Sequence, residues 1–173
     1  MKIKFNPETV TLILEIDNKA IDLNIKRIEA EKLDLLEKKE FHFTIIGSKT
    51  GEEILKSLEN LSKIKRNEIL DKIRKTSELI NWIVNPENNF YYLENSYNNP
   101  NTIFEKRKSI IQVVTIDKIN EFYEKLNSLL KKQFEVPFPH ITLFTNSTRE
   151  ETKLRWIGIY SKRHFEELNP KDI

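Results

Sequence analysis

Two histidine–threonine pairs are the residues of this chain whose types and spacing are best suited to chemistry. His42 and Thr44 occur in the segment EFHFTIIG, and His140 and Thr142 occur in PFPHITLFT. Side chains two positions apart on a β-strand leave the same face, roughly 6.6 Å from each other. Each segment, folded as a strand, would therefore present one imidazole and one hydroxyl together. Two such pairs among three histidines have a random expectation of roughly one in a hundred.

The chemistry that these residue types permit is proton transfer at a phosphate. Imidazole has an ordinary pKa of about 6.5, so of two neighbouring rings one can be neutral and the other protonated. Cleavage of a phosphodiester needs a base for the attacking oxygen and an acid for the departing oxygen. The hydroxyls of Thr44 and Thr142 can bind the non-bridging oxygens. The sequence has no cysteine, no HExxH motif and no dense cluster of acids and histidines, so nothing indicates a metal ion or cofactor.

Hydrophobic periodicity predicts the elements that must position these pairs. The predicted strands span residues 9–16, 40–47, 90–93, 109–116, 137–145 and 154–160. The predicted helices span residues 23–38, about 52–84 with a break near Ser62 or Asn67, 118–132 and 161–168. Further expectations are helix caps at Thr50 and Asp117, and another helix that starts at Ser147 or Thr148.

The predicted elements form a weak internal repeat. The order strand, helix, histidine strand, helix, strand occurs on both sides of NSYNNPN, residues 95–101. The strand-to-histidine spacing is also similar, with 32 residues from Val10 to His42 and 30 from Ile110 to His140. We therefore expect one domain, residues 1–173, built from two pseudo-symmetric lobes at about 1–97 and 98–173. A twofold axis between the lobes would bring the two histidines together.

Two H-x-T motifs on apolar strands, in a duplicated βαβαβ chain of this length, resemble the two-histidine (2H) phosphoesterase superfamily. This group includes cyclic nucleotide phosphodiesterases, RNA 2′,5′-ligase-like proteins and phage enzymes that degrade cyclic oligonucleotide signals. The specific match is confined to HFTI and HITL. The resemblance implies that His42 and His140 are the acid/base pair and that Thr44 and Thr142 bind phosphate. It also implies an α+β fold, with a bilobal antiparallel sheet or distorted barrel, helices outside and the histidines in a central groove.

Several other residues are candidates for contact with a substrate. Tyr91, Tyr92 and Trp156 could stack on a nucleobase, although core packing is the stronger expectation for each. Arg107 could bind a second phosphate, but an exposed position at the start of a strand is the simpler interpretation. We take Tyr92, Arg107 and Trp156 as the substrate-binding candidates. His164 is expected on the surface of a helix, and five apolar residues of the histidine strands are assigned to the core: Phe41, Phe43, Ile45, Ile141 and Leu143.

Composition restricts the partners of the chain. Its 29 Lys and Arg against 27 Asp and Glu give a net charge of +2, which suits a small anionic ligand better than a long duplex. The absence of cysteine excludes disulfides, thiolate zinc sites and a cysteine nucleophile. The start of the sequence lacks an apolar signal stretch and no run approaches the length of a membrane span. A cytoplasmic protein without a membrane partner is therefore the default expectation. The oligomeric state is left open.

These observations favour a metal-independent phosphodiesterase that acts on a small nucleotide or an RNA 2′/3′ end. The bond would involve a ribose 2′-oxygen, as in a 2′,3′-cyclic phosphate, a 2′,5′ linkage or a small cyclic oligonucleotide, and would be cleaved or reversibly ligated. The sequence leaves open which histidine is the acid. The alternative is an inactive relative that binds a nucleotide or RNA end. A structural protein and a metal-dependent hydrolase have less support.

Overall fold

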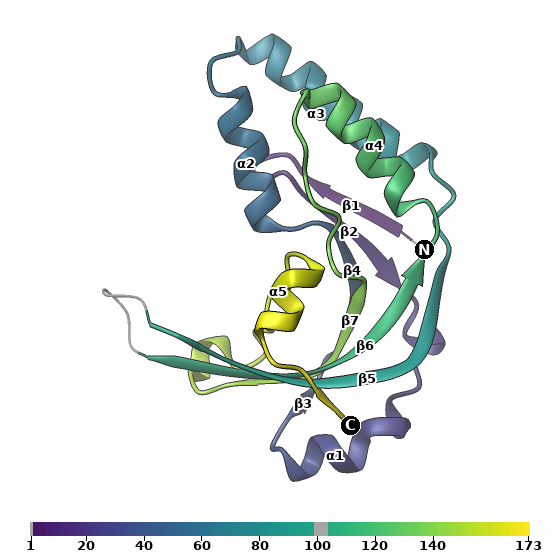
Figure 1. The fold of residues 1–173 in the computed structure, drawn as a ribbon, viewed down its shortest axis with the longest axis vertical. Helices are drawn as coiled ribbons and strands as arrows, with labels where there is room; N and C mark the ends of the chain where they lie inside the picture. The colour runs from purple at the N-terminus through teal and green to yellow at the C-terminus, as the bar shows by residue number, and fades with distance from the viewer. Residues whose placement is uncertain (1, 99–103) are drawn as a thin grey trace.

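Two antiparallel sheets carry the two histidine strands, one in each sheet (Figure 1). The computed structural model describes residues 2–98 and 104–173, and the fold of this part is mixed α+β. The three-stranded sheet has the order β1 (Lys2–Asn6), β2 (Thr11–Ile16), β4 (Phe41–Ile46). The five-stranded sheet has the order β3 (Leu36–Glu37), β7 (His140–Ser147), β6 (Glu105–Ile116), β5 (Val84–Tyr97), β8 (Lys171–Asp172). Within the described residues both sheets are open, so the predicted antiparallel α+β class is confirmed without a closed barrel.

Helices cover the sheets. They are α1 (Arg27–Lys32), α2 (Ser48–Leu58), α3 (Lys63–Leu79), α4 (Ile119–Leu130) and α5 (Lys162–Glu167). Figure 1 shows α2, α3 and α4 grouped beside the three-stranded sheet, and α5 lies against the five-stranded sheet through Phe165, whose ring packs edge-on against Tyr91 of β5. None of the helices in residues 2–98 and 104–173 has both the length and the apolar character that a membrane span needs.

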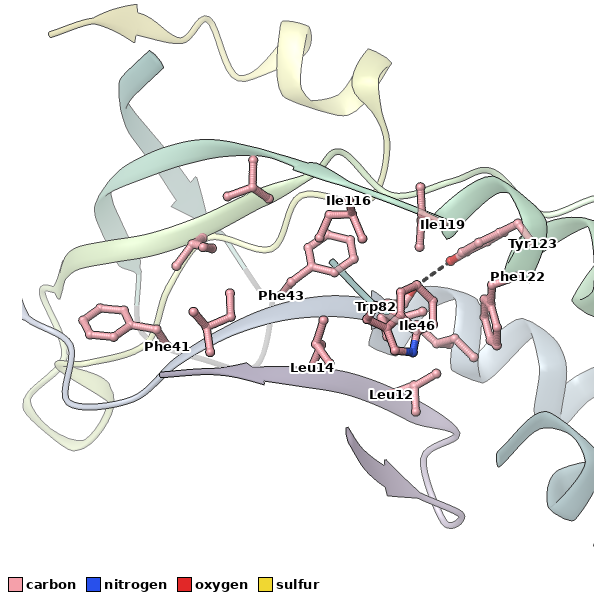
Figure 2. Packing of buried hydrophobic residues seen from close by; sticks show 14 of the residues in the cluster. Leu12, Leu14, Phe41, Phe43, Ile46, Trp82, Ile116, Ile119, Phe122 and Tyr123 are labelled. Carbon is pink, nitrogen blue, oxygen red and sulfur yellow. Dashed lines mark hydrogen bonds between the residues drawn. The ribbon is translucent and has the colours of Figure 1, made fainter. Parts of the chain in front are cut away.

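The core lies between the sheets and the helices. In β4 the side chains alternate as predicted, because Phe41, Phe43 and Ile45 are buried while His42 and Thr44 are partly exposed. In β7 the apolar residues Ile141 and Leu143 are buried as well, so the core assignments are confirmed. One continuous cluster joins residues of β2, β4, β6 and β7 with α2, α3 and α4, and Figure 2 shows part of it. The Tyr123 hydroxyl of α4 donates a 2.7 Å hydrogen bond to the Ile45 carbonyl and ties that helix to the His42 strand.

Most predicted elements exist, with shifted ends. The predicted strand at 90–93 is the middle of the longer β5, and β7 begins at His140 rather than at residue 137. The long helical stretch breaks near Ser62 as predicted, because the Ser62 hydroxyl accepts a hydrogen bond from the Lys65 backbone N–H and caps α3. The predicted helix ends at Leu79, before residue 84. The sequence patterns missed three short strands: β1, β3 and β8.

The predicted strand at residues 154–160 is wrong, since this segment has no regular secondary structure. Its apolar residues Ile157 and Ile159 are nevertheless buried, in a second small cluster. Side chains of other segments, and not a neighbouring strand, donate hydrogen bonds to the backbone carbonyls of residues 155 and 156. Thr145 Oγ1 donates to the Arg155 carbonyl at 3.1 Å and Arg107 Nη1 donates to the Trp156 carbonyl at 3.3 Å. Alternating apolar residues here reflect burial without strand pairing.

The predicted helix at 23–38 is shorter than expected. A 3₁₀ turn (Leu23–Lys26) precedes α1, and Asp34, with a φ of 57°, turns the chain into β3. The helical spacing of apolar residues overpredicted the length of the helix. Leu35 is buried as that spacing requires, but its backbone lies beyond the end of α1. The helix predicted from Ser147 or Thr148 is also wrong. Ser147 belongs to β7, the Thr148 backbone pairs with that of Lys106 in β6, and only a 3₁₀ turn (Glu150–Thr152) follows.

Both predicted helix caps are wrong. Thr50 lies inside α2, whose N-cap is Gly47. The N-cap of α4 is Lys118, in a left-handed conformation without a side-chain bond, and the preceding Asp117 donates its backbone N–H to the Ile83 carbonyl at 3.0 Å.

The predicted lobe boundary falls within a β-hairpin. Residues 95–97 of the predicted loop continue β5 and pair with β6 as far as Tyr97 and Glu105, while residues 99–101 lie outside the described residues. The five-stranded sheet therefore takes β3 and β5 from residues 1–97 and β6, β7 and β8 from residues 98–173. Division of the chain into two lobes remains a prediction.

Candidate active site

A single hollow between the two sheets brings both histidine–threonine pairs together. His42 and Thr44 of β4 and His140 and Thr142 of β7 line it, together with Lys38 and Trp156. Contact between β4 and β7 joins the two sheets at this point. Alternation along each strand places the apolar partners, Phe43 and Ile141, in the core and the polar pairs in the hollow.

The environment of His140 fixes its hydrogen-bonding pattern. Its Nδ1 lies 2.8 Å from the Phe138 carbonyl. A carbonyl oxygen can only accept, so Nδ1 carries a hydrogen and Nε2 is left to exchange protons with a ligand. Burial lowers the pKa of His140 to about 4, and the Phe138 carbonyl acts in the opposite direction by favouring the protonated ring. The ring is therefore neutral near pH 7 and has one free nitrogen.

His42 is shifted in the same direction with different neighbours. Burial, together with the positive charges of Lys38 and then His140, lowers the pKa of His42 to about 4. The edge of the ring packs against Trp156, with ring centroids 5.3 Å apart and an interplanar angle of 70°. The charge of His140 thus acts on His42, and both rings line the same hollow.

Lys38 also lines the hollow, and no sequence pattern predicted it. Its side chain is only 9% exposed, and Nζ lies 3.7 Å from the centroid of the Trp156 ring. Burial lowers the pKa of Lys38 to about 8, and the nearby Glu40 opposes this shift. Lys38 precedes β4, which begins at Phe41, so the alternation of His42 and Thr44 along that strand does not extend to it. The sequence therefore carried no periodic signal for this residue.

The hollow is narrow. Its cavity volume is only about 10 Å³. Such a space admits about one water-sized group. A phosphate group therefore enters only if a lining side chain moves.

The three predicted substrate-binding residues lie in different places. Trp156 lines the hollow. Arg107 lies behind Trp156, bonded to its carbonyl, and is largely buried in an ion pair with Glu105 at 2.8 Å, so the exposed position expected for it is wrong. Tyr92 is 8% exposed within the main core and donates to Glu94 at 2.9 Å, away from the hollow. Core packing, the stronger expectation for Tyr92, is confirmed.

The surrounding residues offer no obvious metal site. In the part of the chain that the structure describes, no three His, Asp or Glu side chains are grouped to hold a metal ion. The third histidine, His164, lies on α5, partly buried and stacked on Tyr160 at 4.8 Å.

Comparison with protein-family models, curated proteins and solved structures finds no match to this chain. The resemblance to two-histidine phosphoesterases therefore rests on the two H-x-T segments and on the order of the elements, and the roles that it implies for the histidines and threonines remain predictions.

Proposed function

We propose that the hollow is the active site of a metal-independent phosphodiesterase of the two-histidine kind. One observation carries this proposal: two imidazoles and two hydroxyls from different sheets line a single small space. Two exchangeable ring nitrogens supply a base and an acid, and Thr44 and Thr142 supply hydrogen bonds to a phosphate between them. A duplicated H-x-T pair has no comparable use in core packing.

The neighbours of the two rings favour His42 as base and His140 as acid. A bound phosphate anion raises the pKa of both rings. The Phe138 carbonyl favours the cationic form of His140, whereas Lys38 disfavours the cationic form of His42. In the proposed reaction His42 takes the proton of the attacking hydroxyl as its oxygen bonds to phosphorus. The opposite P–O bond breaks, and His140 Nε2 gives its proton to the departing ribose oxygen.

The proposed substrate is a small nucleotide or an RNA end whose phosphate involves a ribose 2′-oxygen. The preference for this bond comes from the family resemblance. The small hollow and the net charge of +2 support a compact phosphate ester over a long duplex. Trp156, 38% exposed at the edge of the hollow, is the proposed surface for a base, with Arg107 holding its backbone.

The same proposal includes two lobes with one H-x-T strand each around a central groove. It is supported by the order of elements, since strand, helix and histidine strand occur in this order as β2, α1, β4, with the short β3 before β4, and again as β6, α4, β7.

The test is incubation with a panel of 2′,3′-cyclic, 2′,5′-linked and 3′,5′-linked nucleotides, with chelator present, followed by mass spectrometry. Replacement of His42 or His140 by Ala should reduce turnover by about 100-fold or more. His164→Ala, outside the hollow, should leave it unchanged. Turnover by His42→Ala at the native rate would refute the mechanism. Tight binding without product would instead indicate the inactive, nucleotide-binding alternative.

A further inference from the structure

Lys38 is a buried cation without an ion-pair partner in the described part of the chain, although the charge of the nearby Glu40 acts on it. Within residues 2–98 and 104–173, none of the ion pairs involves Lys38, and its backbone N–H donates to the Leu143 carbonyl at 3.0 Å. Lysine is seldom buried without a partner, because the ammonium loses its hydration. The Trp156 ring compensates for part of this loss through the cation–π contact.

The rest of the hollow is complementary to an anion. The other lining groups are two imidazoles that are neutral near pH 7 and two hydroxyls, and no carboxylate is among them. A phosphate oxygen in this space would find hydrogen-bond donors and would place a negative charge in direct contact with Lys38. The ammonium would also stabilise the charge that develops on the phosphoryl oxygens during reaction.

Trp156 is the lining residue best placed to move. The two histidines and two threonines are in strands, and the backbone of Lys38 is bonded to β7. Trp156 is 38% exposed and lies in a segment without helix or strand. The hollow needs such a movement, because the space that it leaves is too small for a phosphate.

We propose that Lys38 binds a non-bridging oxygen of the substrate phosphate, and that the Trp156 ring covers Lys38 until this anion displaces it. The inference rests on the proposed function and adds a third charged group to the site. It assigns to Lys38 the recognition of the phosphate itself, whatever nucleoside is attached. The competing interpretation is structural, with the cation–π contact serving only to hold residues 36–40 in place.

The first experiment measures inorganic phosphate binding by calorimetry and thermal unfolding for Lys38→Met, Lys38→Arg and the wild-type protein. Lys39→Met is the matched control, because the neighbouring Lys39 is exposed and does not line the hollow. Lys38→Met should weaken phosphate binding by about tenfold or more, and Lys38→Arg should retain part of it. Lys38→Met should also raise Tm by about 3 °C, because a buried charge is removed. Lys39→Met should change neither quantity.

The outcomes separate this inference from the proposed function. If the Lys38→Met protein binds phosphate as tightly as the wild-type protein, the proposed role of Lys38 is overturned. This holds even if the histidine variants lose turnover. A lower Tm together with lost binding also overturns it, in favour of the structural interpretation. Loss of binding with a raised Tm supports the inference, even if the nucleotide panel yields no product and the phosphodiesterase proposal fails.

The second experiment follows Trp156 by fluorescence. The chain has two tryptophans, and the other, Trp82, is buried with its Nε1–H bonded to the Ser77 carbonyl. Phosphate should change the emission of the wild-type protein with the same midpoint as calorimetry. Trp156→Phe should bind phosphate without a change in emission. Unchanged wild-type emission at phosphate concentrations that saturate the calorimetric signal would refute displacement of the ring.

Discussion

His42 and His140 lie in the hollow as neutral imidazoles, and this makes the stability of the protein dependent on pH. In the folded state the pKa of each ring is about 4, compared with about 6.5 in an unfolded chain. Between these values the unfolded state binds protons that the folded state does not, so stability falls as the pH falls from 6.5 to 4 and is fully present above 6.5. The contribution is at most about 3 kcal/mol for each ring.

This dependence is measurable by urea unfolding at pH 7.5 and pH 4.5. The wild-type free energy of unfolding should be lower at pH 4.5. In the double variant His42→Gln, His140→Gln the difference between the two pH values should be smaller. An equal difference in the double variant would mean that other groups cause the loss.

A second consequence at the level of the residue is proton uptake when an anion binds. Because both rings are neutral near pH 7, a phosphate that forms a charged hydrogen bond with His140 must bring a proton to Nε2 from solution. Calorimetry at pH 7 in buffers of different ionisation enthalpy should show uptake of about one proton. His140→Gln should abolish the uptake, and His42→Gln should retain it. The reverse result would exchange the acid and base roles.

The two H-x-T pairs could be found from sequence because alternation along a strand is a local rule. Lys38 and Trp156 could not be found in this way. Lys38 lies outside the strand, and Trp156 reaches the hollow through an irregular segment held by the side chains of Thr145 and Arg107. Their positions depend on tertiary contacts, which leave no periodic signal.

At the level of elements, the close packing of α2 on the β1–β2 turn depends on Gly51. A Cβ at this position would lie 2.2 Å from the Thr9 carbonyl oxygen and 3.0 Å from that of Val10, both backbone atoms. Gly51→Ala should therefore destabilise the protein by about 1 to 3 kcal/mol, despite the better helix propensity of alanine. Gly47→Ala is the matched control, because its Cβ would make only an ordinary 3.6 Å contact with Thr44. Chemical denaturation measures both, and equal stabilities would disprove the close packing.

Elements were predictable where burial and hydrogen bonding follow the same period. β4 satisfies both conditions, since its apolar side chains alternate and its backbone pairs with β2. In residues 154–160 the alternation of Ile157 and Ile159 is present without a pairing partner. In residues 23–38 the helical spacing continues past Asp34, where the backbone reverses. The pattern of apolar residues therefore indicates which side chains are buried, but it does not indicate which partners form hydrogen bonds with the backbone.

At the level of the whole molecule, the site exists because two sheets share one core. The internal repeat predicted that the two histidines would come close, and both line one hollow. The repeat did not predict that β5 would pair with β6 along most of its length. Long-range strand pairing is decided by the assembled sheet, so a boundary drawn from loop composition can fall within a hairpin.

These shared contacts predict that neither half of the chain folds alone. Without residues 98–173, β5 loses β6, β3 loses β7, and α3 loses its contact with α4. The fragments 1–97 and 98–173 should each lack a cooperative thermal transition in circular dichroism. Co-expressed, they should associate and recover phosphate binding, because Lys38 and His42 come from one fragment and His140 and Trp156 from the other. A cooperative transition in fragment 1–97 alone would make the lobes independent domains, and the hollow would then be an interface between them.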